Sequence, residues 1–360
     1  MTVFTKVIRT LALLLSLLVL ITSFGALLNS HLYQAPAILT LCGLFLPVII
    51  VLCLFLLIFW LAARSFWVLV PIATLFVNYP FIIAVFQFNN GTTAVVQETQ
   101  QPITLCTYNV QGISYGQTEL TLRLLADFVR QEGIDILCMQ EMDEKAKTIT
   151  DSLMASIGGL RFSVTAPGSQ PGFALTTHSR YPLLNAVDRR FEQTGNHALH
   201  VDVLFQGDTL RLYNIHLQTT HFNQRKQGLE VEDLVWNLGD KKGKANQLIN
   251  SLQANTIMRN QQSSTLTTAI QRSPYPVIAC GDFNAHPASY PYMLFHNVLE
   301  DGFRSSGKGY EYTYRYLGNL LRIDYCFHDK SLKGLSYRSH ELDFSDHKAV
   351  VFTLSGARAD

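Results

Sequence analysis

Six short apolar runs in this chain each end in polar residues that can bind a metal ion, carry a proton or donate a hydrogen bond. Such runs are typical of buried strands, whose last side chains emerge at the rim of a sheet, where functional groups collect. One polar strand end needs no explanation beyond solvation, but six indicate a site. The residues concerned are Asn109, Glu141, His216, Asp282 with Asn284, Asp324, and Ser345 with Asp346 and His347.

Hydrolysis of a phosphate ester is the chemistry that these residue types suit. It requires charge to hold the phosphate, a water made nucleophilic, and stabilisation of the departing oxygen. Glu141 is a hard oxygen ligand of the kind that Mg²⁺ or Mn²⁺ prefers. Asn284 points to the same side as Asp282 if the backbone stays extended, and its amide can then donate to a phosphate oxygen. The alternative interpretations are a solvated strand cap at Glu141 and a simple turn at Asp282 to Asn284.

In their order along the chain, these residues resemble the motifs of the endonuclease/exonuclease/phosphatase superfamily. Its members include DNase I-like nucleases, sphingomyelinases and inositol-polyphosphate phosphatases. The resemblance covers about residues 103–354, and the combination of motifs is far more specific than any one of them. It implies an α/β fold, a four-layer α/β/β/α sandwich whose active site lies where the strand ends of both sheets meet.

The resemblance also implies roles for the residues. Asp282 is expected to orient or deprotonate the attacking water, and His347 to contact the phosphate while Asp324 holds it. An aspartate partner fixes the tautomer of an imidazole and raises its pKa. His216 is typical of DNase-like and sphingomyelinase-like members. The implied metal ligands for Mg²⁺ or Mn²⁺ are Asn109, Glu141 and Asp346, and the implied catalytic residues are His216, Asp282, Asn284, Asp324 and His347.

Residues 1–88 are predicted to be a membrane anchor. No Asp, Glu, Lys or Arg occurs from Thr10 to Ala63, and after Arg64 none occurs until Glu98, although 15% of the chain is charged. Three apolar spans fit the ~20 residues that cross a bilayer. A cleaved signal peptide is the alternative for the first span, but the later two would still anchor the protein. The predicted spans are 10–28, 36–61 and 66–88, with a polar linker at 89–102.

Basic residues predict the orientation of this anchor. Lys6 and Arg9 precede the first span, and Arg64 lies between the second and third. The positive-inside rule makes both places cytoplasmic, so an odd number of spans puts the rest of the chain on the other side. We therefore expect a multi-pass membrane protein with its catalytic domain on the periplasmic or extracellular side.

Residues 103–360 are predicted to be the catalytic domain. Short apolar runs alternate there with helical periodicity, as in residues 118–131, which is typical of a mixed α/β domain. Four cysteines inside the predicted strands are expected to be small buried side chains rather than disulfides. They are Cys106, Cys138, Cys280 and Cys326.

The charge balance bears on the partners. Of 28 basic residues, three lie in the anchor, which leaves 25 against 27 acidic residues, a net charge near −2. Enzymes that bind DNA without specificity more often present a basic surface, so nucleic acid is not favoured. The expected partner is a phosphate-ester substrate, with lipid among the candidates because of the anchor, and we expect no obligate protein partner.

The sequence thus predicts a membrane-anchored, metal-dependent phosphoesterase that cleaves a phosphodiester or a phosphomonoester. One alternative is an endonuclease or exonuclease acting on nucleic acid. An alternative of another class is a non-catalytic anchored binding module with the same fold. Retention of every motif group argues against the binding module, because a protein that loses catalysis usually loses at least one of them.

Overall fold

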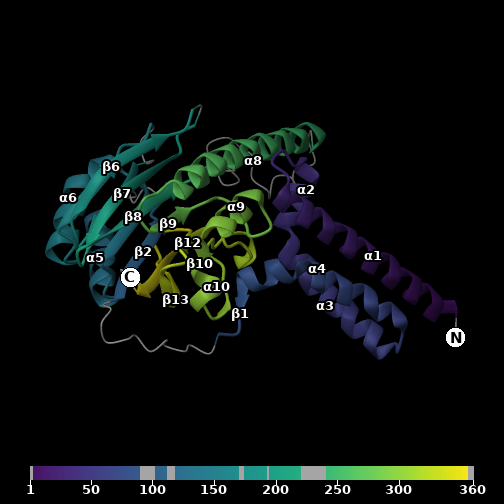
Figure 1. Ribbon diagram of the computed structural model, residues 1–360. Coiled ribbons are helices and arrows are strands. Elements are labelled where there is room, and N and C mark those ends of the chain that lie inside the picture. Colours follow the sequence, from purple (N-terminus) through teal and green to yellow (C-terminus); the bar gives the residue numbers. More distant parts are fainter. Residues whose placement is uncertain are drawn as a thin grey trace. The chain divides into compact units, whose positions relative to one another are not determined.

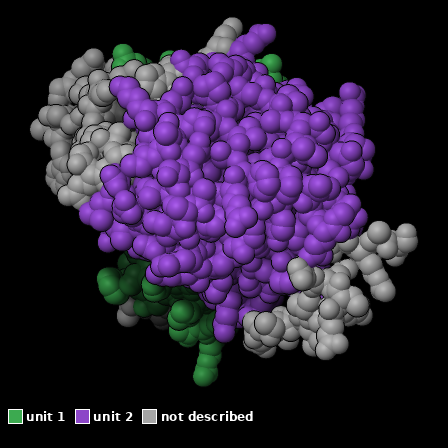
Figure 2. Space-filling model, turned by 90° about the vertical axis from the view of Figure 1, so that its left-hand side faces the viewer, with its two compact units in different colours: residues 1–84, 220–261, 286–293 green, residues 85–219, 262–285, 294–360 purple. Residues whose placement is uncertain are grey.

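The computed structural model describes residues 3–89, 102–111, 118–169, 174–192, 194–219 and 241–355 (Figure 1). Residues 90–101 of the predicted linker lie outside this range. The chain divides into two compact units, residues 1–84 with 220–261 and 286–293, and residues 85–219 with 262–285 and 294–360 (Figure 2). The first unit therefore includes two segments that follow the predicted anchor in the chain.

The first unit contains apolar helices that could cross a membrane. Two are long and apolar enough by themselves, and a bent pair, α2 with α3, makes up to three candidate spans among the described residues. Polar side chains join them: Trp60 donates a hydrogen bond to Ser16 at 3.0 Å, and Asn78 donates to Ser23 at 2.8 Å. These helices are α1 Val3–His31, α2 Ala37–Leu44, α3 Leu46–Ala62, η1 Phe66–Val68 and α4 Leu69–Val85.

The second predicted span differs from the structure, because it is broken. The helices α2 and α3 meet at Phe45 with a bend of 61°. Pro47 stands in the first turn of α3, where a proline is tolerated because that turn needs no backbone donor. In one continuous helix its ring would crowd the preceding turn, which favours a break here, although Pro80 is accommodated inside α4.

The first unit also holds part of the chain that follows the Asp282 motif. Asn29 of α1 donates a hydrogen bond to the carbonyl of Ala288 at 2.8 Å, and Thr40 of α2 donates to Asn29 at 3.1 Å. Gly43 lies so close to this segment that a Cβ built on it would come within 2.4 Å of the His286 ring. Small and amide side chains at the ends of α1 and α2 thus fit residues 286–288.

Among the described residues, the second unit is built on two six-stranded sheets. Neighbouring strands are antiparallel except for β2 with β3 and β8 with β9, which are parallel. The first sheet has the order β13 Lys333–Glu341, β14 Lys348–Ser355, β2 Pro102–Asn109, β3 Ile136–Met142, β5 Ala174–Ser179, β4 Phe162–Ala166. The second has the order β10 Glu300–Asp301, β12 Asp324–His328, β9 Val277–Asp282, β8 Asp208–His216, β7 His197–Phe205, β6 Leu183–Arg190.

Helices α5 and α6 pack on the outer face of the first sheet, and the helix predicted over 118–131 is confirmed as α5. A short ribbon of β1 Phe86–Gln87 and β11 Gly309–Tyr310 stands apart from both sheets. The mixed α/β fold with two sheets packed among helices is therefore as predicted. The helices with residues in this unit are α5 Thr118–Gln131, η2 Glu144–Ala146, α6 Lys147–Ser156, α10 Gly302–Ser306 and η3 Leu317–Asn319, together with the later parts of α8 Lys241–Gln271 and α9 Tyr290–Val298, whose earlier residues belong to the first unit.

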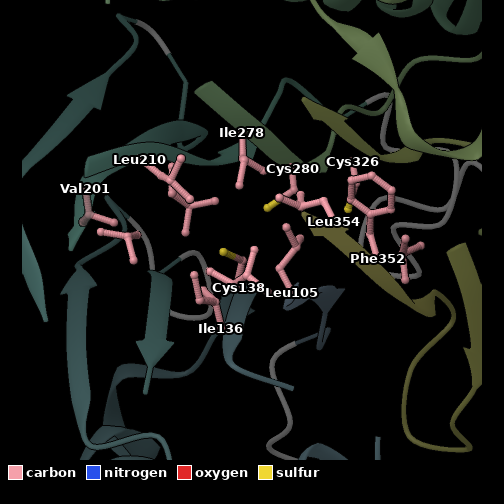
Figure 3. Close-up of a cluster of buried hydrophobic side chains, with 14 of the residues drawn as sticks. Leu105, Ile136, Cys138, Val201, Leu210, Ile278, Cys280, Cys326, Phe352 and Leu354 are labelled. Atoms are coloured by element: carbon pink, nitrogen blue, oxygen red, sulfur yellow. The ribbon is translucent and has the colours of Figure 1, made fainter. Parts of the chain in front are cut away.

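The main core lies between the two sheets (Figure 3). Leu105 and Cys138 from the first sheet meet Leu210, Ile278 and Cys280 from the second. All four strand cysteines are buried and free, as predicted. Packing of this apolar surface is the main force that presses the two sheets together.

A buried ion pair lies at one edge of this core. Arg322 and Asp301 are both fully buried and form two hydrogen bonds of 2.6 Å. The guanidinium lies over the rings of Phe303 and Tyr325, at 4.9 and 4.6 Å from their centres. Each charge therefore depends on the other to offset its desolvation cost, because neither is solvated by water.

We expect Asp301→Ala to lower the free energy of unfolding by about 3–5 kcal/mol, because it leaves the Arg322 charge buried and unpaired. The control is Glu119→Ala, which breaks a 2.7 Å pair with Arg123 whose side chains are 58% and 52% exposed. That pair is screened by water, so its loss should cost below about 1 kcal/mol. Denaturant unfolding followed by circular dichroism compares the two, and equal losses would contradict the prediction.

Candidate active site

The strands of both sheets carry side chains from the dry core up to one shared rim. In β8, Leu210 and Leu212 belong to the inter-sheet core, and Asn214 and His216 follow on the same face. The change from apolar to polar therefore occurs along a single strand face. β9 repeats it, since Ile278 and Cys280 lie in the core and Asp282 follows.

Glu141 reaches the rim through a break in strand regularity. Cys138 packs in the inter-sheet core, whereas Met139 and Met142 both pack on the opposite face. Two positions three residues apart share a face only if the strand holds one extra residue. The pairing of β3 with β5 shifts between Met139 and Met142, and Glu141 has a φ of 54°. The bulge thereby turns the Glu141 carboxylate out of the normal alternation.

Gly281 allows Asp282 to lie against β8. Its φ is 143°, and a Cβ there would come within 1.9 Å of the carbonyl oxygen of Ile215. No larger residue fits without displacing the parallel pairing of β8 with β9, which sets His216 directly opposite Asp282. The glycine is thus required by a close approach of two backbones.

Asp282 is the centre of the site. Its buried carboxylate accepts hydrogen bonds from the amides of Asn109 at 3.0 Å and Asn284 at 3.2 Å, and from the backbone nitrogen of Asn284 at 2.8 Å. The Nε2 atoms of His216 and His347 each lie 3.8 Å from its Oδ2. The carboxylate of one sheet is therefore shared among groups from both.

His347 is hydrogen-bonded to Asp324. Its Nδ1 donates to the Asp324 carboxylate at 2.9 Å, and both side chains are buried. Thr313 fixes Asp324 in turn, because its hydroxyl oxygen accepts from the backbone nitrogens of Ile323 and Asp324 at 2.9 Å each. With Nδ1 engaged, Nε2 is the His347 atom that faces the Asp282 side of the site.

Burial raises the pKa of three carboxylates in the site, those of Glu141, Asp282 and Asp346. The pKa of Glu141 is raised to about 7 by desolvation, with Asp282 and Asp346 adding to the rise, while a 3.1 Å hydrogen bond from Asn109 opposes it. The pKa values of Asp282 and Asp346 are also raised, in both cases chiefly by desolvation. Three acidic groups thus share a region where their negative charge is poorly solvated.

The imidazole of His347 is charged at neutral pH. Burial by itself lowers its pKa, but the carboxylates of Asp324, Asp282 and Asp346 outweigh this and raise the pKa to about 10. A positive donor therefore stands beside the acidic groups, where it would favour an anionic ligand.

The donor set fits a hard divalent cation. Glu141, His216 and Asp282 offer ligand atoms within 4.8 Å of one another, and so do Asp282, Asp324 and His347. The Oδ1 atom of Asp346 is buried and accepts no hydrogen bond from any residue that the structure describes. Carboxylates with raised pKa values and an open acceptor are what a cation bound through oxygen would neutralise.

The structure places the predicted residues at one rim, but not all of them follow an apolar strand as expected. Asp324 begins β12, and residues 345–347 lie just before β14, so these groups reach the rim at the start of a strand.

The side chains of Asn109 and Asn284 also differ from expectation. Asn109 turns its amide nitrogen to the carboxylates, and its oxygen accepts from the backbone nitrogen of Gln111 at 3.0 Å. Asn284 has a φ of 47°, so the backbone is not extended, and its amide donates to Leu217 at 3.0 Å as well as to Asp282.

Sequence reasoning missed several residues around the site. Thr313 and Tyr314 follow no apolar run, so no signal in the sequence pointed to them, yet the Tyr314 ring lies 5.2 Å from the His347 ring. Gln140 and Asn214 did carry a signal, because each is a polar residue that interrupts an apolar run of the sequence. That signal predicts a polar contact between strands rather than a catalytic role.

Residues 106–347 match the sequence pattern of the Endonuclease/Exonuclease/phosphatase family. The match covers more than half of the chain and includes every residue of the site described above. The protein therefore belongs to this family, as the resemblance of its motifs implied. A search of curated proteins found none that matches the chain.

Solved structures share the fold of the second unit. The endonuclease/exonuclease/phosphatase from Bacteroides vulgatus has 14% identity and a TM-score of 0.53 over 72% of this chain and 100% of its own. The one from Beutenbergia cavernae has 16% identity and a TM-score of 0.51 over 71% and 72%. TDP2 from D. rerio, complexed with a single strand DNA product, has 17% identity and a TM-score of 0.51 over 71% and 100%. At these identities the likeness concerns the fold alone.

We expect Gly281→Ala to disorder the rim, because the new methyl group meets a backbone carbonyl that cannot move without breaking the β8 and β9 pairing. Gly207→Ala is the matched control in the turn between β7 and β8. Its φ is 91°, but a Cβ there meets nothing within 4 Å, so the control adds backbone strain without a clash. The strain itself should cost about 1–3 kcal/mol.

The melting temperatures of both variants, followed by circular dichroism, measure the difference. Gly281→Ala should lose clearly more stability than Gly207→Ala. If the two variants lost the same amount, strain alone would explain Gly281, and the close approach would not matter.

Proposed function

We propose that the protein is a membrane-anchored, metal-dependent phosphoesterase that hydrolyses a phosphodiester or a phosphomonoester by attack of an activated water. The main support for this proposal is the environment of the Asp282 carboxylate. It is buried between two histidines and accepts hydrogen bonds from two side-chain amides where the two sheets meet. Members of this family are usually phosphoester hydrolases, which supports the proposal.

The proposed metal ligands are Glu141, Asp346 and Asn109. Glu141 and Asp346 offer carboxylate oxygens, and Asn109 offers its amide oxygen once the amide turns over, because that oxygen now accepts from Gln111. Bound there, Mg²⁺ or Mn²⁺ would supply positive charge against the phosphate and the departing oxygen.

Residues of the chain would accept the proton of the attacking water and orient the phosphate. Asp282 is the proposed base, and burial raises its pKa toward the range in which a carboxylate accepts a proton effectively. His347, held by Asp324 through Nδ1, donates from Nε2 to a phosphate oxygen.

His216 and Asn284 complete the proposed catalytic set. The His216 imidazole lies 3.5 Å from the nearer Glu141 oxygen, on the same side of the site as Asp282. Asn284 donates to Asp282 and to the carbonyl of Leu217, so it orients the base as well as lying beside the phosphate position. Together the two residues would fix the position of the phosphate relative to the Asp282 carboxylate.

We expect hydrolysis to depend on a divalent cation. Full-length protein in detergent is assayed with bis(p-nitrophenyl) phosphate, phospholipid vesicles, single-stranded DNA and a sugar phosphate, each with Mg²⁺, with Mn²⁺ and after chelation. At least one ester should be cleaved only with metal. Glu141→Gln should lower kcat by about 10²-fold or more, because it removes a charge that helps to hold the metal ion.

Glu144→Gln is the matched control. Glu144 lies three residues further on and is exposed, and its carboxylate accepts a hydrogen bond from the backbone of Gly168. It should leave kcat unchanged. Turnover that survives chelation, or an equal loss in both variants, would disprove the metal assignment, and absence of turnover on every ester would favour the binding module.

We also propose that the catalytic domain lies on the non-cytoplasmic side and that the bent helix pair α2 with α3 is one span. A reporter fused after Ala35 or after Gln101 should then report a non-cytoplasmic position, and one fused after Arg64 a cytoplasmic position, as the basic residues require. A non-cytoplasmic signal after Arg64 with a cytoplasmic signal after Gln101 would contradict the proposal. The reporter after Ala35 then separates the causes, because a non-cytoplasmic signal there means that the pair does not cross, and a cytoplasmic signal means that the orientation is reversed.

A further inference from the structure

A buried polar contact joins the two sheets immediately beneath the site. Gln140 of β3 donates from Nε2 to Oδ1 of Asn214 in β8 at 2.7 Å, and both side chains are buried. β3 belongs to one sheet and β8 to the other, so this bond crosses the space that apolar side chains fill elsewhere.

Both amides are held at more than one point. Gln140 also donates to the hydroxyl of Thr107 in β2 at 3.0 Å. Asn214 donates to the backbone carbonyls of Met139 in β3 and Thr176 in β5, at 3.2 and 3.1 Å. The Asn214 side chain of the second sheet is therefore hydrogen-bonded to two strands of the first sheet.

Gln140 and Asn214 lie next to two site residues, Glu141 and His216, whose separation the site must fix. Gln140 directly precedes Glu141, and Asn214 lies on the same face of β8 as His216, two residues earlier. The Glu141 carboxylate and the His216 imidazole approach within 3.5 Å. Glu141 and His216 belong to different sheets, so any sliding of one sheet over the other would change that distance.

We propose that Gln140 and Asn214 are positioning residues, whose bond fixes the register between the two sheets and with it the separation of Glu141 and His216. The inference rests on the proposed function for its effect on turnover. Apolar packing cannot serve this purpose alone, because it is not directional and tolerates small shifts, whereas a network of hydrogen bonds specifies one arrangement.

Stability does not explain Gln140. Its Oε1 is buried and accepts no hydrogen bond within the part of the chain that the structure describes, which is a cost to folding. Methionine has a similar shape and no polar atom to satisfy, so Gln140→Met should be tolerated by the fold. The bond to Asn214 is what that variant removes.

The test compares Gln140→Met, Asn214→Leu and the double variant with the wild type, all as full-length protein in detergent. Kinetics on bis(p-nitrophenyl) phosphate with Mn²⁺ give kcat and KM, and electron paramagnetic resonance gives the affinity for Mn²⁺. Each single variant should lose about 10- to 100-fold in kcat or in Mn²⁺ affinity, the range for residues that support metal ligands. The double variant should be no worse than the poorer single variant, because the residues act as a unit.

Thr353→Val is the matched control. The Thr353 hydroxyl bonds to that of Thr104 at 3.1 Å, between β14 and β2, so the control removes a side-chain bond that does not cross between the sheets. It should leave kcat and Mn²⁺ affinity as in the wild type.

A readout independent of metal and turnover separates this inference from the proposed function. His216 is fully buried, so diethyl pyrocarbonate should not modify it in the wild type or in the control, but should modify it in the Gln140 and Asn214 variants. If the wild type cleaves no ester, the proposed function fails, and the labelling still decides the positioning role. Labelling equal to that of the control, or losses that multiply in the double variant, would overturn that role.

Discussion

Everything in the site depends on keeping the Asp282 carboxyl group buried, and its charged form stabilised, where the two sheets meet. Burial makes that charge costly, and two amides, a backbone nitrogen and two nearby imidazoles offset the cost. The same surroundings make the group chemically useful, because a desolvated carboxylate has a raised pKa and a stronger tendency to accept a proton. The same contacts around Asp282 thus both stabilise the fold and prepare the site for chemistry.

The strands that reach the site are layered in the same way. At the bottom lie leucine, isoleucine and cysteine side chains from both sheets (Figure 3). Above them is the polar layer of Thr107, Gln140 and Asn214, and above that the groups proposed to act on the substrate. The hydrogen bonds of this polar layer therefore begin where the apolar packing ends. Because they are directional, they fix the geometry of the rim next to them.

The rim itself departs from regular strand geometry. Glu141 and Asn284 have positive φ values, and Gly281 needs a conformation and a clearance that other residues lack. Each such position costs about 1–3 kcal/mol and persists only where the surroundings enforce it. The paired strands and the buried contact of Arg322 with Asp301 are among the interactions of the same unit that meet this requirement.

The sequence by itself determined the class of fold, the apolar helices and the identity of the polar residues at the ends of β2, β3, β8 and β9, because periodicity and the change from apolar to polar are local properties. It could not determine the bulge at Glu141, the turned amide of Asn109 or the break at Phe45, since each depends on what neighbouring strands or helices allow. Thr313 and Tyr314 belong to no local pattern and meet Asp324 and His347 only when the chain folds back. The contact of Gln140 with Asn214 was also decided by tertiary structure, because the packing of two sheets brings together residues that are 74 positions apart.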